Sequence, residues 1–186
     1  MLKITVPQSE LFNEQTNEVY HVKEQTLILE HSLLSISKWE SKMHKPFFNR
    51  KKEEQTMEEQ VCYLRCATIG TPLDDSAYYA ILYNQALATQ IDEYFKDPMT
   101  ATTFGNNDTR RNNSRSRRKM TSEEVYYYMV AYNIPFECEK WHINRLMTLI
   151  HVCEAKNSKE KMSKRSIYAQ NRELNAARRA KLHSKG

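Results

Sequence analysis

The stretch that decides the fold is Tyr132–Leu146, YNIPFECEKWHINRL, which crowds a cysteine, a histidine, a tryptophan and an arginine into fifteen residues. Proline disfavours helical backbone in the residue before it, so one helix should end there and another should begin at Pro135 or Phe136. Acidic residues in the first turn of the second helix complement its dipole. Large apolar residues then recur at helical spacing, at Ile143, Leu146, Met147, Ile150 and Cys153. The stretch therefore predicts a joint between two helices of a core, with Trp141 anchoring the preceding helix.

Helix signals continue on the N-terminal side of this joint. Thr121 stands three residues before Glu124, the spacing of a capping box, which predicts a helix from there to about residue 133. Earlier helices are predicted at 32–43 capped by Ser32, at about 54–69, at 77–84 capped by Asp75 or Ser76, and at about 84–96. Only three glycines occur in the chain, which also favours helices over an all-β fold.

The N-terminal residues have a different pattern. Segments 2–6, 18–22 and 26–31 (LKITV, EVYHV and TLILEH) are rich in β-branched and aromatic residues, and the intervening NEQTN supplies turn residues. We therefore expect a mainly α protein: a small helical domain with a short N-terminal antiparallel β element and a basic C-terminal helical arm. The expected body is 1–155, which includes a mobile basic loop at 99–120, and the arm is 156–186.

Charge is strongly segregated along the chain. The net charge is +5, but residues 110–119 carry six positive charges, and residues 156–186 carry ten basic and two acidic side chains. The remainder is therefore acidic. Such segregation favours an anionic partner, or attraction between the arm of one chain and the body of another.

The two basic segments supply the candidate binding residues. We expect partner contacts from Arg115, Arg117 and Arg118 of the loop and from Arg165, Arg172, Arg178, Arg179 and Lys181 of the arm. These side chains could bind phosphates. No aromatic residue is interleaved in the basic run 110–119, so base stacking is not indicated.

The sequence gives little sign of enzyme chemistry. Phosphate-cradling loops need clustered glycines, and none are present. Cys62 and Cys66 share a helix face, as Cys138 and His142 would in the predicted helix, but neither pair has the spacing of common zinc modules. We expect reduced cysteines, a capping or surface role for His142, no metal, no cofactor and no catalytic residue.

Targeting signals are also missing from the pattern. The first residues, MLKITVPQSE, lack the basic flank and apolar run of a signal peptide, and no run of 18 apolar residues occurs. We therefore expect no membrane association and a cytoplasmic location.

Four stretches carry a resemblance to a known family: LEHSLLSISKWESKMHKPF, DPMTATTF, EEVYYYMVAYNIPFECEKWHINRLMTLIHVCEAKN and MSKRSIYAQNRELNAARRAKLHSKG. Together they resemble the tail assembly chaperones encoded in the tail modules of long-tailed bacteriophages. The resemblance implies a protein that binds the tape-measure protein in the host cytoplasm and assists tail-tube assembly, with little or none of it in the mature virion. The basic segment 110–119 departs from the family's pattern, so no function is transferred to it.

Two other functions stay open at this point. The chain could be a structural virion protein of the tail or neck, or a nucleic-acid-binding protein that uses its basic loop and arm. Self-association and contact with the tail-tube protein are further expectations.

Overall fold

The computed structural model describes residues 1–13, 18–48, 55–103, 120–160, 168, 171–173 and 175. The chain divides into two compact units, Met1–Thr148 and Leu149–Gly186. In the described residues the first unit is mainly helical with a small N-terminal antiparallel β element, as predicted. In the second unit, helix α6 continues to Glu160, and residues 168, 171–173 and 175 are helical and exposed.

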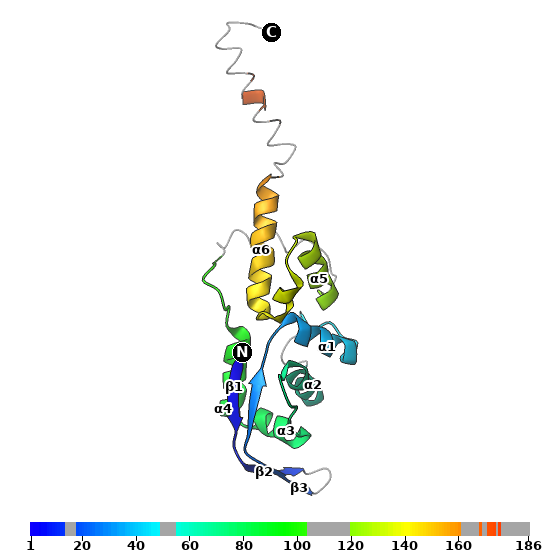
Figure 1. Ribbon diagram of the computed structural model, residues 1–186, viewed down its shortest axis with the longest axis vertical. Helices are drawn as coiled ribbons and strands as arrows, with labels where there is room; N and C mark the ends of the chain where they lie inside the picture. The colour runs from blue at the N-terminus through cyan, green and yellow to red at the C-terminus, as the bar shows by residue number, and fades with distance from the viewer. Residues whose placement is uncertain are drawn as a thin grey trace. The chain divides into compact units, whose positions relative to one another are not determined.

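The N-terminal strands form a bent two-stranded ribbon (Figure 1). Strand β1 (Leu2–Val6) pairs antiparallel with β4 (Gln25–Leu29), and β2 (Ser9–Asn13) pairs antiparallel with β3 (Glu18–Val22). We call β1–β4 the inner half and β2–β3 the outer half. The ladder is interrupted at Pro7, which has no backbone N–H to donate. The sequence patterns did not indicate β2, and residues 14–17 of the predicted turn lie outside the described residues.

The inner half is part of the core. Its inward side chains, Ile4, Val6, Leu27 and Leu29, are at most 4% exposed. The second edge of β4 is also hydrogen-bonded, because Glu30 N–H donates to the Ala67 carbonyl (2.8 Å) and Ile69 N–H donates to the Ile28 carbonyl (2.9 Å). The inner half is therefore held both by side-chain packing and by backbone bonds.

Helix α1 (Leu33–Met43) begins and ends where the sequence predicted. The Ser32 side chain accepts a hydrogen bond from Ser35 N–H (3.3 Å), and His44 ends the helix in the left-handed conformation at a φ of 52°. The buried Trp39 donates from its indole N–H to the Glu59 carbonyl (3.0 Å) and so ties α1 to α2.

The next three helices differ from prediction only at their ends. Helix α2 (Met57–Ala67) begins after a capping box formed by Thr56 and Glu59, later than the predicted residue 54. Helix α3 (Asp75–Tyr83) follows Asp74 rather than Asp75 or Ser76. Helix α4 (Gln85–Lys96) is capped by Asn84, whose Oδ1 accepts from the N–H groups of Ala86 (3.1 Å) and Leu87 (3.3 Å).

The predicted capping box at Thr121 is wrong. Helix α5 (Ser122–Ala131) begins there, but the Thr121 side chain makes no capping hydrogen bond. A buried carboxylate from α1 replaces it, because Glu40 Oε2 accepts from Ser122 N–H (2.7 Å) while Oε1 accepts from Phe47 N–H (2.6 Å). A partner 82 residues away therefore holds the start of α5.

The predicted long helix from Pro135 is also wrong, because the chain forms two elements there. A 3-10 helix, η3 (Phe136–Lys140), precedes α6 (Ile143–Glu160). The break has a tertiary cause: Ile143 N–H donates to the His31 carbonyl (2.8 Å), which holds the chain against the β4–α1 junction. Trp141 at the break is half-buried, with the Arg145 guanidinium 4.0 Å from its ring centre.

Candidate interaction surfaces

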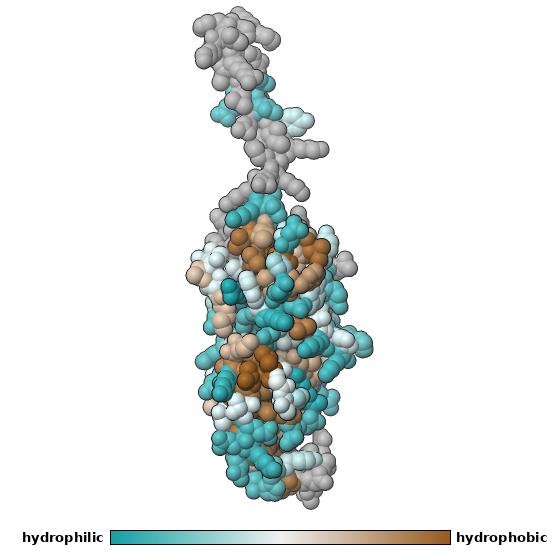
Figure 2. All heavy atoms as spheres, viewed as in Figure 1, coloured by the Kyte–Doolittle hydropathy of each residue, from teal (hydrophilic) through white to brown (hydrophobic). Residues whose placement is uncertain are grey.

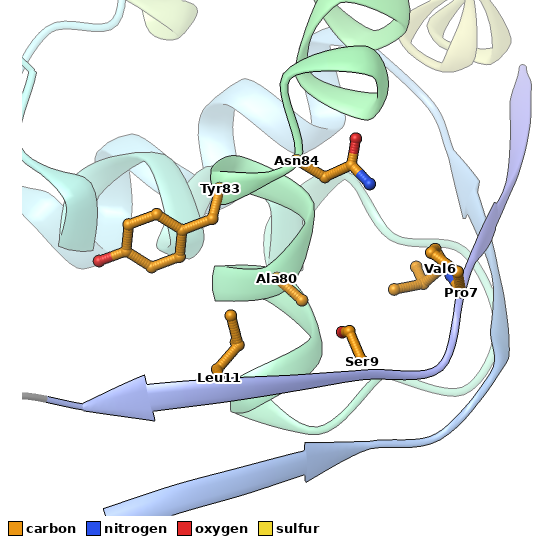
Figure 3. A pocket seen from close by; sticks show the side chains of 7 residues that line it. All are labelled: Val6, Pro7, Ser9, Leu11, Ala80, Tyr83 and Asn84. Carbon is orange, nitrogen blue, oxygen red and sulfur yellow. The ribbon is translucent and has the colours of Figure 1, made fainter. Parts of the chain in front are cut away.

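A pocket of about 200 Å³ lies where the ribbon bends against the end of α3 (Figure 3). We call it the bend pocket, and its lining residues are Val6, Pro7, Ser9, Leu11, Ala80, Tyr83 and Asn84. Pockets that enclose drug-sized ligands or cofactors usually measure ~300–1,000 Å³. The bend pocket therefore has room for one side chain rather than for a whole cofactor.

The walls of the bend pocket are mostly apolar, with two polar groups among them. Asn84 uses its carbonyl oxygen to cap α4, so the carboxamide N–H groups are what it can offer a ligand. The hydroxyl of Ser9 stands on the opposite wall, on β2 (Figure 3). Tyr83 is 67% exposed and forms part of the rim. This arrangement suits an apolar side chain whose own backbone can accept or donate one or two hydrogen bonds.

The outer half of the ribbon also carries uncovered apolar side chains. Phe12 and Val19 are directly opposite in the ladder and are 59% and 50% exposed. The neighbouring pair on that face is Glu10 and His21, whose side chains lie 3.2 Å apart.

A second uncovered surface lies on α5 and η3. Val125 and Met129 are fully buried on one side of α5, whereas Tyr127 and Val130 on the other side are 68% and 60% exposed. Phe136 of η3 adds a side chain that is 56% exposed. We call Tyr127, Val130, Ala131 and Phe136 the α5 face; hydrophobic residues gather at the position of α5 in Figure 2. A helix with apolar residues on every side is normally covered on every side. The described residues cover only the side of α5 that carries Val125 and Met129, so the opposite side is open to a partner.

The most concentrated group of titratable side chains is a buried histidine–tyrosine cluster. The His31 ring stacks on Phe95 at 4.4 Å between ring centres, meets His142 edge-on at 5.0 Å, and is hydrogen-bonded through Nδ1 to the Tyr63 hydroxyl. Burial and, to a lesser extent, the nearby His142 together lower the pKa of His31 to about 3. His31 is therefore neutral and fully packed at physiological pH.

His142 is the helix-capping residue that the sequence predicted. Its Nδ1 accepts from Asn144 N–H (3.3 Å) and its Nε2 bonds to the Tyr94 carbonyl (3.0 Å), which fixes the neutral tautomer with the proton on Nε2. Burial lowers the pKa of His142, against the raising effect of the Tyr94 bond. The expected shared helix face with Cys138 is wrong, because Cys138 lies on η3 and precedes the start of α6. The cluster holds helices together.

The four cysteines are free thiols, and two of them, Cys66 and Cys138, lie in poor environments for nucleophilic chemistry. Burial, then the neighbouring Cys62, raises the pKa of Cys66 to about 11, and burial also raises the pKa of Cys138. Among the described residues, no three His, Cys, Asp or Glu side chains are placed to hold a metal ion. In the same part of the chain, no helix has both the length and the apolar character needed to cross a membrane.

The predicted partner-binding residues fall mostly outside the described part of the chain. This holds for Arg115, Arg117, Arg118, Arg165, Arg178, Arg179 and Lys181. Arg172 is described, and it is helical and exposed. Sequence reasoning missed the α5 face, although the run VYYYMVAY, apolar on every side, is a signal that could have found it.

No family model, no curated protein and no solved structure matches this chain.

Proposed function

We propose that this chain is a non-enzymatic tail assembly chaperone of a long-tailed bacteriophage, which binds the tape-measure protein in the host cytoplasm and assists tail-tube assembly. Support comes first from the four stretches that resemble this family, which together span much of the chain. The mainly helical fold supplies helix faces on which such a client could pack.

The observation that carries a binding role is the α5 face. Tyr127, Val130 and Ala131 follow the i, i+3, i+4 spacing by which one helix packs on another, and Phe136 extends the same apolar surface. A long client that keeps apolar helical segments out of water needs such a surface. We assign the tape-measure protein to the α5 face for this reason.

The chemistry of the described thiols and histidines supports the non-enzymatic part of the proposal. A catalytic cysteine needs its thiolate, and the raised pKa of Cys66 and of Cys138 keeps both protonated at neutral pH. In the cluster, His142 uses both ring nitrogens and His31 uses Nδ1 in structural hydrogen bonds.

The test is capture of the tape-measure protein encoded beside this chain, after co-expression of the two. The double variant Tyr127→Ser with Val130→Ser should lower the captured amount about tenfold or more, because exposed aromatic anchors dominate many interfaces. The matched control is Phe12→Ser with Val19→Ser, which removes two apolar side chains of comparable exposure (59% and 50%, against 68% and 60%) from the outer half and should leave capture unchanged. Equal capture by all three proteins would refute the assignment to the α5 face.

Mass spectrometry of purified virions tests the chaperone role itself. A chaperone should be absent from the particles or present far below the tube protein. A stoichiometric amount would instead establish a structural protein of the tail or neck. Steeply salt-dependent DNA binding that disappears in the Arg115→Ser, Arg117→Ser, Arg118→Ser triple variant would favour the nucleic-acid alternative.

A further inference from the structure

We infer that the bend pocket receives a large aliphatic side chain from the C-terminal arm (residues 156–186) of a second copy of this chain, and that the chain self-associates in this way. The inference concerns a surface separate from the α5 face and does not depend on the identity of the client. Three properties of the pocket and the arm carry it: size, charge and the spacing of apolar residues.

The size of the pocket sets the kind of ligand. A volume of about 200 Å³ with mostly apolar walls accommodates a single leucine, isoleucine or aromatic side chain. The hydroxyl of Ser9 and the carboxamide N–H groups of Asn84 are the polar groups at its walls, and they can bond the backbone next to an inserted side chain. The ligand that fits is therefore a polypeptide that presents one large apolar residue.

Charge sets the character of that polypeptide. The lining stretches, residues 6–11 and 80–84, contain no lysine or arginine, and the chain outside residues 110–119 and 156–186 carries a net charge of −9. Individual carboxylates near the pocket are paired, such as Asp75 with Arg65 and Glu10 with His21, and Glu10 lies on the face of β2 opposite Ser9 and Leu11. An apolar pocket in an acidic body attracts a basic segment from a distance.

The arm has the complementary composition. Residues 156–186 carry ten basic and two acidic side chains, and their large aliphatic residues are isolated: Ile167, Leu174 and Leu182. Ile167 follows Lys164 and Arg165, and Leu182 follows Lys181. Three large aliphatic residues are too few to give an isolated helix a stable buried face. The arm therefore gains stability only by packing on the surface of another body.

Reciprocity favours a second copy as the source of the arm. Each chain carries one acidic pocket and one basic arm, so two chains can exchange arms and satisfy both contacts in a closed two-fold dimer. Excess charge of one sign would then be neutralised in both chains at once.

Analytical ultracentrifugation of the full-length chain tests the inference. The wild type should form a dimer at low salt that weakens as salt rises, because screening acts on exposed charges. Tyr83→Lys places a cation at the pocket rim and should raise the dimer dissociation constant about tenfold or more. The matched control is Tyr127→Lys, since Tyr83 and Tyr127 are 67% and 68% exposed and differ only in their surface.

A charge swap separates this contact from a general loss of stability. One variant carries Glu10→Lys and Tyr83→Lys, and the other carries Arg178→Glu, Arg179→Glu and Lys181→Glu. Each should be monomeric alone, and an equal mixture should form heterodimers, because the basic pocket then meets the acidic arm. Replacing Ile167, Leu174 and Leu182 by serine, one at a time, should identify the inserted residue by the loss of the dimer.

Three results would overturn the inference. They are a wild type that stays monomeric at low salt and micromolar concentration, equal dimerisation of Tyr83→Lys and Tyr127→Lys, and a charge-swap mixture that stays monomeric. Capture of the tape-measure protein is measured separately on the α5 variants, so either proposal can fail without the other.

Discussion

The two halves of the β ribbon differ in how well their apolar side chains are covered. The inner half buries Leu27 and Leu29 completely, whereas the outer half leaves Phe12 and Val19 more than half or half exposed. Strand β1 alternates apolar and polar residues, whereas the outer half places apolar pairs on both of its faces, Leu11 with Tyr20 on one and Phe12 with Val19 on the other. Only the rest of the fold decides which of these apolar side chains become core and which stay on the surface.

The cause of the difference lies outside the strands. The backbone at the end of α2 bonds the second edge of β4 through the Ala67 carbonyl and the Ile69 N–H, which ties the inner half to the helices. The ribbon bends at Pro7 (Figure 1), and although α3 contacts β1, β2 and β3, Phe12 and Val19 of the outer half stay exposed. Apolar residues that remain uncovered in this way are candidates for contact with other chains.

The largest contrast should come from truncating one apolar side chain in each half. Leu27→Ala should lower the free energy of unfolding by about 2–5 kcal/mol, because it leaves a cavity in packed surroundings. Phe12→Ala removes a larger side chain but should cost far less, since the ring is 59% exposed. Urea denaturation of both variants measures the comparison. Equal losses would show that the outer half is packed as tightly as the inner one.

The next effect is the pH dependence of stability that comes from His31, close to the end of strand β4. Folding lowers the pKa of His31 from 6.5 to about 3, so the unfolded chain binds a proton that the folded chain does not. The resulting stability is fully present above pH 6.5 and is lost as pH falls towards about 3, with a limiting slope of about 1.4 kcal/mol per pH unit. His31→Gln should flatten that slope between pH 6.5 and 5. An unchanged slope would assign the acid sensitivity to other groups.

A smaller effect on stability is expected from Phe12 and Val19, the exposed apolar pair of the outer half. Phe12→Ser with Val19→Ser should change the free energy of unfolding by no more than about 0.5 kcal/mol per site, the usual range for exposed positions. Thermal melts of the double variant and the wild type provide the comparison. A loss as large as that of Leu27→Ala would mean that something covers this face in solution.

The smallest effect should come from Glu10 and His21, the exposed pair beside Phe12 and Val19. Both side chains are more than two-thirds exposed, at 71% and 74%, so water screens their attraction. Glu10→Gln should change the free energy of unfolding by less than about 0.5 kcal/mol. Repeating the melt at high salt serves as the control, because screening should abolish even that difference.

Elements with local signals could be predicted from the sequence. Ser32 caps α1 through a residue three positions away, and Leu33, Ile36 and Trp39 mark its buried side by spacing alone. The helix break before Ile143 could not be predicted, because it depends on a hydrogen bond to the distant His31. The missing cap at Thr121 has the same origin, since a glutamate from α1 took over its role.

The two candidate surfaces differ in the same way, since one has a local sequence signal and the other depends on residues that are distant in the sequence. The α5 face is visible in the composition of a single helix. The bend pocket combines Ser9 and Leu11 with Ala80 and Tyr83, which only the folded ribbon brings together. Because β2 itself was not predicted, no reasoning from spacing could have placed these side chains opposite each other.

The second edge of β4 has a consequence for how the molecule opens. An amide exchanges its hydrogen with solvent only when its bond breaks, and segments with fewer anchors open more often. The amides of Glu30 and Ile69 should therefore exchange only when the first unit unfolds as a whole, while those of the outer half should exchange through local fraying. Amides of the inner half would then exchange slowly, with unfolding of the whole first unit, and amides of the outer half would exchange fast. The change from slow to fast exchange would fall at the bend at Pro7.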